Sequence, residues 1–172
     1  ELKENEFRKL FEVDLEQVAE SLKVDCTIET DLRVLIPEEY VQSISERLAL
    51  YTRLDEIEDE ETLAAFIKEI KDRFGDLPNE VQDMIELVKC RWKAQVLGIE
   101  KILLKNNNLK FHFVSSESAR PLDQNLIVKV ISFVNNKKGL CQLREKAGKM
   151  ILQIDKVSSI QELNTILVDI LG

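Results

Sequence analysis

The first 24 residues carry apolar side chains at loose spacing. The candidate anchors of one or two helical turns are Phe7, Leu10, Phe11, Val18 and Leu22. We expect residues 1–24 to be an N-terminal extension that connects to an upstream domain, and residues 25–172 to form the domain itself. The alternation of apolar and polar residues at 26–29 predicts a short strand.

Three segments with apolar residues three and four positions apart follow, and each predicts an amphipathic helix. The first is expected to begin at Pro37, because proline suits the first turn of a helix. Its predicted core face is Val41, Ile44, Leu48 and Tyr51. The second helix carries Leu63, Phe66, Ile67, Ile70 and Phe74 and ends at Gly75. The third carries Val81, Met84, Ile85, Val88 and Trp92 and ends at Gly98.

The acids between Asp55 and Glu61 precede the second helix, where the helix dipole stabilises negative charge.

The pattern then changes to short apolar runs separated by turn residues. Runs at 99–104 and 109–114 flank an asparagine-rich turn and predict a β-hairpin. A helix with Leu126, Val130, Ile131 and Val134 on its core face is expected next. A second hairpin, 140–145 with 150–154, turns at Ala147 and Gly148. The last helix is predicted from a capping-box pattern, Ser158 with Gln161 or Ser159 with Glu162, and its core face is Leu163, Ile166, Leu167 and Ile170.

This order predicts an α+β fold: a three-helix N-terminal part followed by antiparallel hairpins interleaved with helices. A doubly wound parallel sheet is excluded by the tight hairpins. The apolar fraction of 44% and the charged fraction of 33% are typical of a globular domain. No signal peptide or membrane-spanning stretch is evident, and three widely spaced cysteines favour a reducing cytoplasm.

Catalytic chemistry has few candidates in the sequence. No phosphate-binding loop, dinucleotide fingerprint or nucleophile elbow occurs, so no cofactor or catalytic residue is expected. The cysteines form no CxxC pair, so no metal site is expected either. His112 lies between Phe111 and Phe113, and we expect it to point outward from a strand whose phenylalanines point inward. A hydrolase built around His112 is the weakest hypothesis.

Four segments resemble one known family, in the same order and at compatible spacing. They are LIPEEYV at 35–41, RLALYTRL at 47–54, DRFGDLPNEV at 72–81 and LGI at 97–99. They resemble the C-terminal (TRCF) domain of bacterial transcription-repair coupling factor, often called Mfd. Distinct motifs cover roughly residues 25 to 115, and the order of elements extends the resemblance over the remainder.

The resemblance implies a non-catalytic regulatory domain in nucleotide excision repair. The full-length protein would be an ATP-binding, helicase-like DNA translocase that displaces stalled RNA polymerase and recruits UvrA. Its C-terminal domain would make an autoinhibitory contact with the UvrB-like N-terminal module of the same chain, which masks the UvrA-binding surface. The resemblance assigns this partner interface to Glu69 and Asp72, which lie three positions apart on one helix face. The alternative is two solvated acids offset by Lys68, Lys71 and Arg73.

The charge distribution leaves a second functional hypothesis open. Residues 1–89 have 25 acidic and 11 basic side chains, a net −14, whereas residues 90–172 have 7 and 13, a net +6. The basic half suggests a nucleic-acid-binding accessory domain. Its candidate phosphate contacts are Lys101, Lys105, Lys110, Lys137, Lys138 and Lys149.

Overall fold

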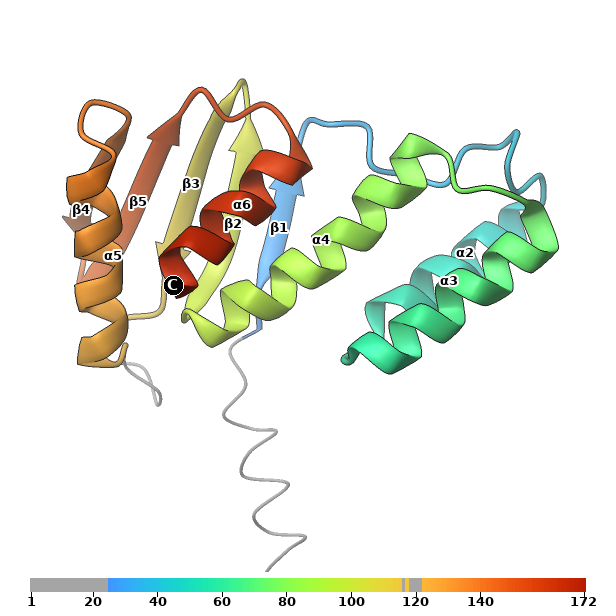
Figure 1. Ribbon diagram of the computed structural model, residues 1–172, viewed down its shortest axis with the longest axis horizontal. Coiled ribbons are helices and arrows are strands. Elements are labelled where there is room, and N and C mark those ends of the chain that lie inside the picture. The colour runs from blue at the N-terminus through green and yellow to red at the C-terminus, as the bar shows by residue number, and fades with distance from the viewer. Residues whose placement is uncertain (1–24, 116, 118–121) are drawn as a thin grey trace, which may run out of the picture.

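A computed structural model describes residues 25–115, 117 and 122–172, so the predicted extension at 1–24 lies outside the described residues. In chain order the helices and strands are β1 (Thr27–Thr30), α2 (Ile44–Asp55), α3 (Glu60–Phe74), α4 (Asn79–Val96), β2 (Ile99–Lys105), β3 (Asn108–Phe113), α5 (Gln124–Asn136), β4 (Cys141–Lys146), β5 (Lys149–Asp155) and α6 (Ile160–Leu171). The predicted α+β fold is confirmed: three helices precede strands that are interleaved with further helices (Figure 1).

Five strands form one mixed sheet in the order β1-β2-β3-β5-β4. Both predicted hairpins are present and antiparallel, and each turns where the sequence supplies residues that accept positive φ. Asn106 and Asn107 have φ of 54° and 56°, and Ala147 and Gly148 have φ of 52° and 73°. The sequence did not predict that β1 pairs with β2 in parallel.

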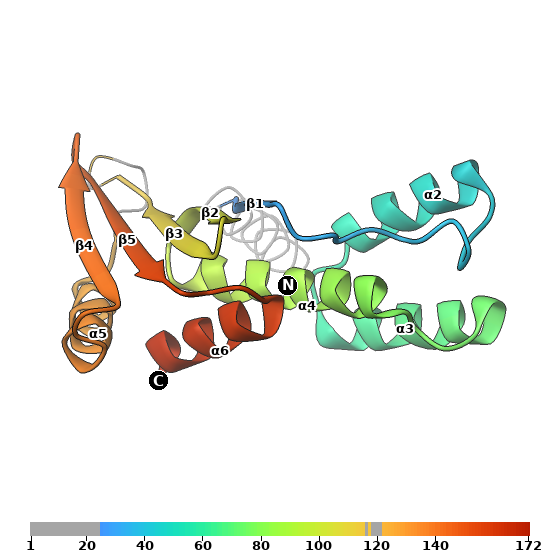
Figure 2. The same cartoon turned by 90° about the horizontal axis from the view of Figure 1, so that it is seen from above.

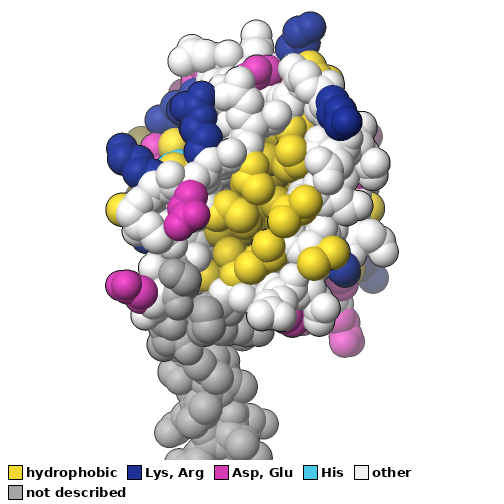
Figure 3. All heavy atoms as spheres, turned by 90° about the vertical axis from the view of Figure 1, so that its left-hand side faces the viewer, with side chains coloured by type: hydrophobic (Ala, Val, Ile, Leu, Met, Phe, Trp, Pro, Cys, Tyr) yellow, Lys and Arg dark blue, Asp and Glu magenta, His cyan; other side chains and the backbone are white. Residues whose placement is uncertain are grey.

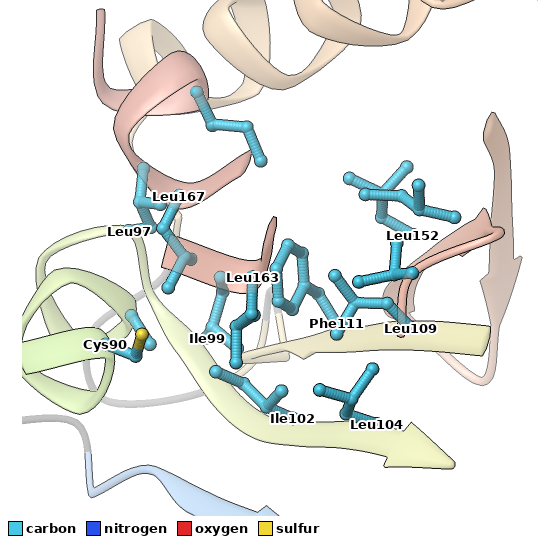
Figure 4. Packing of buried hydrophobic residues seen from close by; sticks show 14 of the residues in the cluster. Cys90, Leu97, Ile99, Ile102, Leu104, Leu109, Phe111, Leu152, Leu163 and Leu167 are labelled. Atoms are coloured by element: carbon cyan, nitrogen blue, oxygen red, sulfur yellow. The ribbon is translucent and has the colours of Figure 1, made fainter. Parts of the chain in front are cut away.

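Helices α4, α5 and α6 cover one face of the sheet, and the opposite face carries no other described element (Figures 1 and 2). The covered face holds the larger hydrophobic cluster, which includes the fully buried Phe111, Leu152 and Leu163 (Figure 4). Burying a side chain of this size contributes about 1.5–3 kcal/mol. The sheet and its three helices are therefore held together mainly by apolar contact.

A second hydrophobic cluster joins α2, α3 and the N-terminal half of α4 beside the sheet (Figure 2). Leu63, Phe66 and Ile70 of α3 meet Val81 and Val88 of α4 there, as the spacing predicted. The C-terminal part of α4 contributes to the larger cluster instead. Helix α4 thus belongs to both cores and fixes the helical part relative to the sheet.

The predicted start of α2 was wrong, and its predicted core face was wrong in part. The helix begins at Ile44, not at Pro37, because the Ser43 hydroxyl caps it by accepting from the Glu46 amide. Pro37 instead starts a turn in which its carbonyl accepts from the Tyr40 and Val41 amides. The predicted core face is half right: Val41 is buried and Tyr51 packs against the smaller cluster, whereas Ile44 and Leu48 are 67% and 61% exposed. The buried residues of the helix itself are Leu50 and Leu54.

The predicted core face of α5 was partly wrong as well. Val130 and Phe133 are the buried residues of this helix, and Ile131 is 43% exposed. In α6 the second capping alternative is the observed one, since Ser159 accepts from the Glu162 amide. The Glu162 carboxylate accepts from the Ser158 amide, so one acid helps to close the start of this helix.

Candidate partner interface

The predicted interface residues Glu69 and Asp72 lie in the last two turns of α3. Asp59 caps the start of this helix by accepting from the Thr62 amide at 2.7 Å. Gly75 ends it with φ of 92°, in the left-handed region that glycine adopts readily. The helix therefore presents a defined C-terminal end on the surface.

Glu69 is held by a neighbouring helix. Its two carboxylate oxygens accept from both terminal nitrogens of Arg53 on α2, at 2.9 and 2.7 Å. The guanidinium of Arg53 also lies 5.3 Å from the centre of the Phe66 ring. The hydrogen bond to Arg53 is the main cause that lowers the pKa of Glu69. Glu69 is thus a charged group in fixed geometry.

A second arginine extends this network at the end of α3. Arg73 donates to Glu46 of α2 at 2.7 Å and lies 3.7 Å from Glu69. Its guanidinium sits 4.7 Å from the centre of the Phe74 ring. We call Glu46, Arg53, Glu69 and Arg73 the α2–α3 charge network.

Asp72 stands apart from this network. It is exposed, and it makes no hydrogen bond or ion pair in the part of the chain that the structure describes. Lys68, Lys71 and Arg73 flank it on the same helix, as noted from the sequence. Of the two predicted residues, Asp72 is the carboxylate that an incoming cation can reach without displacing an internal partner.

The resemblance motifs hold this region together. Arg47 donates to the Val41 carbonyl at 2.6 Å, and the Tyr51 hydroxyl accepts from the Ile36 amide at 2.7 Å. Tyr40 donates to the Gly75 carbonyl at 2.8 Å, which ties the segment before α2 to the end of α3. Arg53 was not predicted as a site residue, although it belongs to the RLALYTRL motif.

The six lysines of the nucleic-acid hypothesis do not share one surface. The strand registers place Lys101, Lys105, Lys110 and Lys149 on the open face of the sheet. Lys137 caps the far end of α5, with Lys138 beside it. Three of the four open-face lysines have acidic partners: Glu29 binds Lys101 at 3.0 Å and Lys105 at 3.2 Å, and Glu100 binds Lys149.

His112 points to the open face, while Phe111 and Phe113 are fully buried on the other side, as predicted. Its cross-strand neighbours are Lys101 and Ile151. Partial burial, followed by the positive charge of Lys101, lowers the pKa of His112. In the described structure no hydroxyl, thiol or carboxylate is hydrogen-bonded to this ring, so the arrangement offers no catalytic dyad.

Residues 25–115, 117 and 122–172 contain no group of three or more His, Cys, Asp or Glu side chains that could hold a metal ion. Within the same ranges, no helix combines the length and the apolarity needed to cross a membrane.

Comparison with known proteins gives consistent matches. The sequence profile of the TRCF domain family matches residues 30–124. Transcription-repair-coupling factor of Staphylococcus epidermidis is 33% identical over 86 residues, which cover 50% of this chain and 7% of that protein. The Borreliella burgdorferi protein of the same name is 24% identical over 143 residues, 80% of this chain and 12% of its own length.

A solved structure extends the likeness to the whole fold. The crystal structure of the C-terminal domain of transcription-repair coupling factor has a TM-score of 0.66, with 15% identity over 87% of this chain and 94% of that chain. At this identity the match concerns the fold. It includes the elements after residue 124, which the family profile does not reach.

Proposed function

Because this chain belongs to the TRCF domain family, the C-terminal domain of transcription-repair coupling factors, we propose that it regulates a longer polypeptide by binding another module of it. The partner in this proposal is the UvrB-like N-terminal module, and the contact is autoinhibitory because it masks the surface that binds UvrA. The domain itself carries out no reaction. The chain spans only 7% and 12% of the two curated relatives described above, so a larger protein around it is part of the proposal.

The observation that carries the proposal is the arrangement of acids at the end of α3. Asp72 is an exposed carboxylate without a partner among the described residues, one turn from Glu69. The C-terminal end of a helix is negatively polarised, so it attracts cationic groups together with these carboxylates. Arginines on the facing module would pair with Asp72 and share Glu69 with Arg53. Exposed pairs of this kind each contribute little free energy, which suits a contact that must open.

The test is calorimetric titration of this chain with the UvrB-like module. Charge reversal of both acids, Glu69→Arg with Asp72→Arg, should weaken binding by about tenfold. Asp72→Arg alone should cause most of the same loss of affinity and leave the fold intact, because Asp72 makes no hydrogen bond or ion pair in residues 25–115, 117 and 122–172. Asp169→Arg makes the same charge change at an exposed site on α6 and serves as the matched control. Unchanged affinity in the Asp72 variant would reject the assigned site.

A second candidate function has one observation in its favour: the open face of the sheet is predominantly basic. By strand register it presents Lys101, Lys105, Lys110, Arg144, Lys146 and Lys149. The internal pairs with Glu29 and Glu100 reduce its charge, so we rank DNA backbone binding below the protein contact. Fluorescence anisotropy with an oligonucleotide at low salt distinguishes the two, since phosphate contacts weaken steeply as salt rises. Absence of binding at about 20 mM salt excludes this candidate.

A further inference from the structure

One edge of the sheet ends in a strand that is paired on a single side. Strand β4 is hydrogen-bonded to β5 through all of Cys141–Lys146, and no described strand lies on its other side. Its outer backbone amides and carbonyls therefore remain available to another extended segment. An added strand would run about 4.8 Å from β4.

An exposed apolar area borders this edge. Figure 3 faces this end of the molecule and shows a continuous hydrophobic area between β4 and α5. Val128 and Ile131 of α5 are 64% and 43% exposed, and Leu140, just before β4, is 41% exposed. A hollow of about 400 Å³ lies alongside, with Ile127, Leu143 and Met150 among its lining residues. The area belongs to the part of the chain beyond the family profile and apart from the α2–α3 charge network.

The two sides of β4 differ in chemistry. Cys141, Leu143 and Glu145 pair with Ile154, Leu152 and Met150, so this side of β4 faces the helices and is apolar except for Glu145 at the rim of the hollow. Gln142, Arg144 and Lys146 face the open side of the sheet. A strand added to β4 would alternate in the same way, with apolar side chains toward α5 and its remaining side chains beside Arg144 and Lys146.

The net positive charge of this region favours an acidic partner segment over a second copy of the chain. Residues 123–146 contain five Lys or Arg and two Asp or Glu side chains, a net +3 in a chain of net −8. Pairing of β4 with β4 of a second copy would bring Arg144 and Lys146 of one copy close to the same two cations of the other. Repulsion between these like charges disfavours that pairing. An acidic strand would instead neutralise both cations.

We propose that β4 and α5 form a docking site for an extended acidic segment of a partner, whose alternate residues are apolar. The segment pairs with the outer edge of β4, inserts its apolar side chains against Ile127, Ile131 and Leu143, and sets its carboxylates beside Arg144 and Lys146. Backbone hydrogen bonds to β4 supply affinity. Selectivity comes from the alternation of the segment, with apolar side chains on one side and carboxylates on the other.

The probe is a blocked peptide of four Val-Glu repeats, titrated into the isotope-labelled chain by nuclear magnetic resonance. Amide shifts should cluster on β4 and α5. A peptide of four Val-Lys repeats should bind at least about tenfold more weakly, because it repels Arg144 and Lys146. A Val-Glu peptide with central proline should also lose binding, since proline cannot donate to the strand ladder.

The peptide affinities of substituted chains show where the peptide binds. Arg144→Glu with Lys146→Glu should weaken the Val-Glu peptide by about tenfold or more and favour the Val-Lys peptide. Ile131→Asp should also weaken binding, with Val128→Asp as a second variant at a more exposed position. Ile44→Asp is the matched control, an exposed isoleucine on α2. Thermal unfolding of each variant checks that the fold is intact.

Three results would overturn the assignment. The first is the absence of shifts on β4 at about millimolar peptide. The second is equal affinity for the Val-Glu and Val-Lys peptides. The third is that analytical sedimentation shows a dimer of the chain and Ile131→Asp dissociates it. The surface would then bind a second copy of the chain and not a partner segment.

Discussion

Arg53 and Glu69 lie 16 positions apart on different helices, yet they meet through two hydrogen bonds of 2.9 and 2.7 Å. This fork connects α2 to α3 on the surface above the smaller hydrophobic cluster. It also keeps the predicted interface carboxylate occupied before any partner arrives. In the proposed contact, a partner arginine would share Glu69 with Arg53 or compete with Arg53 for it, whereas Asp72 has no partner among the described residues.

The pH dependence of stability should report the Arg53–Glu69 pair. The folded-state pKa of Glu69 is lowered from its ordinary value of 4.5, so the pair stabilises the fold above that value. The contribution is lost as pH falls through the lowered folded-state pKa, because protonated Glu69 no longer attracts Arg53.

Urea unfolding of the original chain and of Glu69→Gln at several pH values measures this contribution. The original chain should be the more stable at about pH 7, and the difference should shrink as the pH falls below 4.5 and through the lowered folded-state pKa of Glu69. A difference that is constant over the whole range would contradict the assignment.

Two leucines compare a residue of the larger hydrophobic cluster with an exposed residue of α2. Leu163 is fully buried beneath the sheet, whereas Leu48 is 61% exposed on α2. Leu163→Ala should lower the free energy of unfolding by about 2–5 kcal/mol, because it leaves a cavity. Leu48→Ala should change it by no more than about 0.5 kcal/mol. Chemical unfolding of both variants measures the contrast, and a large loss at Leu48 would mean that this face of α2 is covered.

The elements that the sequence predicted best are those with one apolar face and unambiguous ends. Helix α3 has its apolar residues on a single stripe and a glycine at its end, so both its position and its core face were predictable. The hairpin turns were predictable for a similar local reason. Asn106, Asn107 and Gly148 accept a backbone conformation that most residues avoid.

Helix α2 shows why other features were not predictable. It carries apolar residues on two faces, with Ile44 and Leu48 on one and Leu50 and Leu54 on the other. Periodicity cannot decide between two such stripes, and only the packing against α3 and α4 does. The parallel pairing of Thr27 with Lys101 and the Arg53–Glu69 fork are likewise long-range contacts that leave no local pattern.

The geometry around the candidate interface residues was predictable only in part. The resemblance assigned Glu69 and Asp72, and both lie near the C-terminal end of α3. The internal partners of Glu69 come from α2 and from the next turn of α3. Their role depends on how two helices pack, which no spacing rule encodes.

The three cysteines should react with a thiol reagent at different rates. Burial raises the pKa of Cys90 to about 12, and likewise that of Cys26. At about pH 8 only on the order of one thiol in ten thousand is then ionised, and Cys90 is also fully shielded from solvent. Cys141 is half-buried on the edge strand, and its pKa is raised as well by burial.

Reaction with an aromatic disulfide reagent should therefore be slow in the folded chain, with Cys141 labelled first and Cys90 only after unfolding. Mass spectrometry of the labelled peptides identifies the order. Cys141→Ser should remove the earliest phase and leave the others. Early labelling of Cys90 would indicate that α4 opens more readily than its packing implies.

Loss of the Tyr51 hydroxyl should lower the free energy of unfolding more than loss of the Tyr40 hydroxyl. The Tyr51 hydroxyl accepts from the amide of Ile36, a buried residue, at 2.7 Å. The Tyr40 hydroxyl donates to the exposed Gly75 carbonyl at 2.8 Å and lies 3.3 Å from the Ile70 carbonyl. Tyr51→Phe leaves a shielded amide without a partner and should cost about 1–3 kcal/mol of unfolding free energy. Tyr40→Phe should cost about 0.5–1.5 kcal/mol, since water can replace the lost donor. Urea unfolding of the two variants under the same conditions gives the comparison. The reverse order would show that the Tyr40 contact restrains the end of α3 more strongly than its exposure suggests.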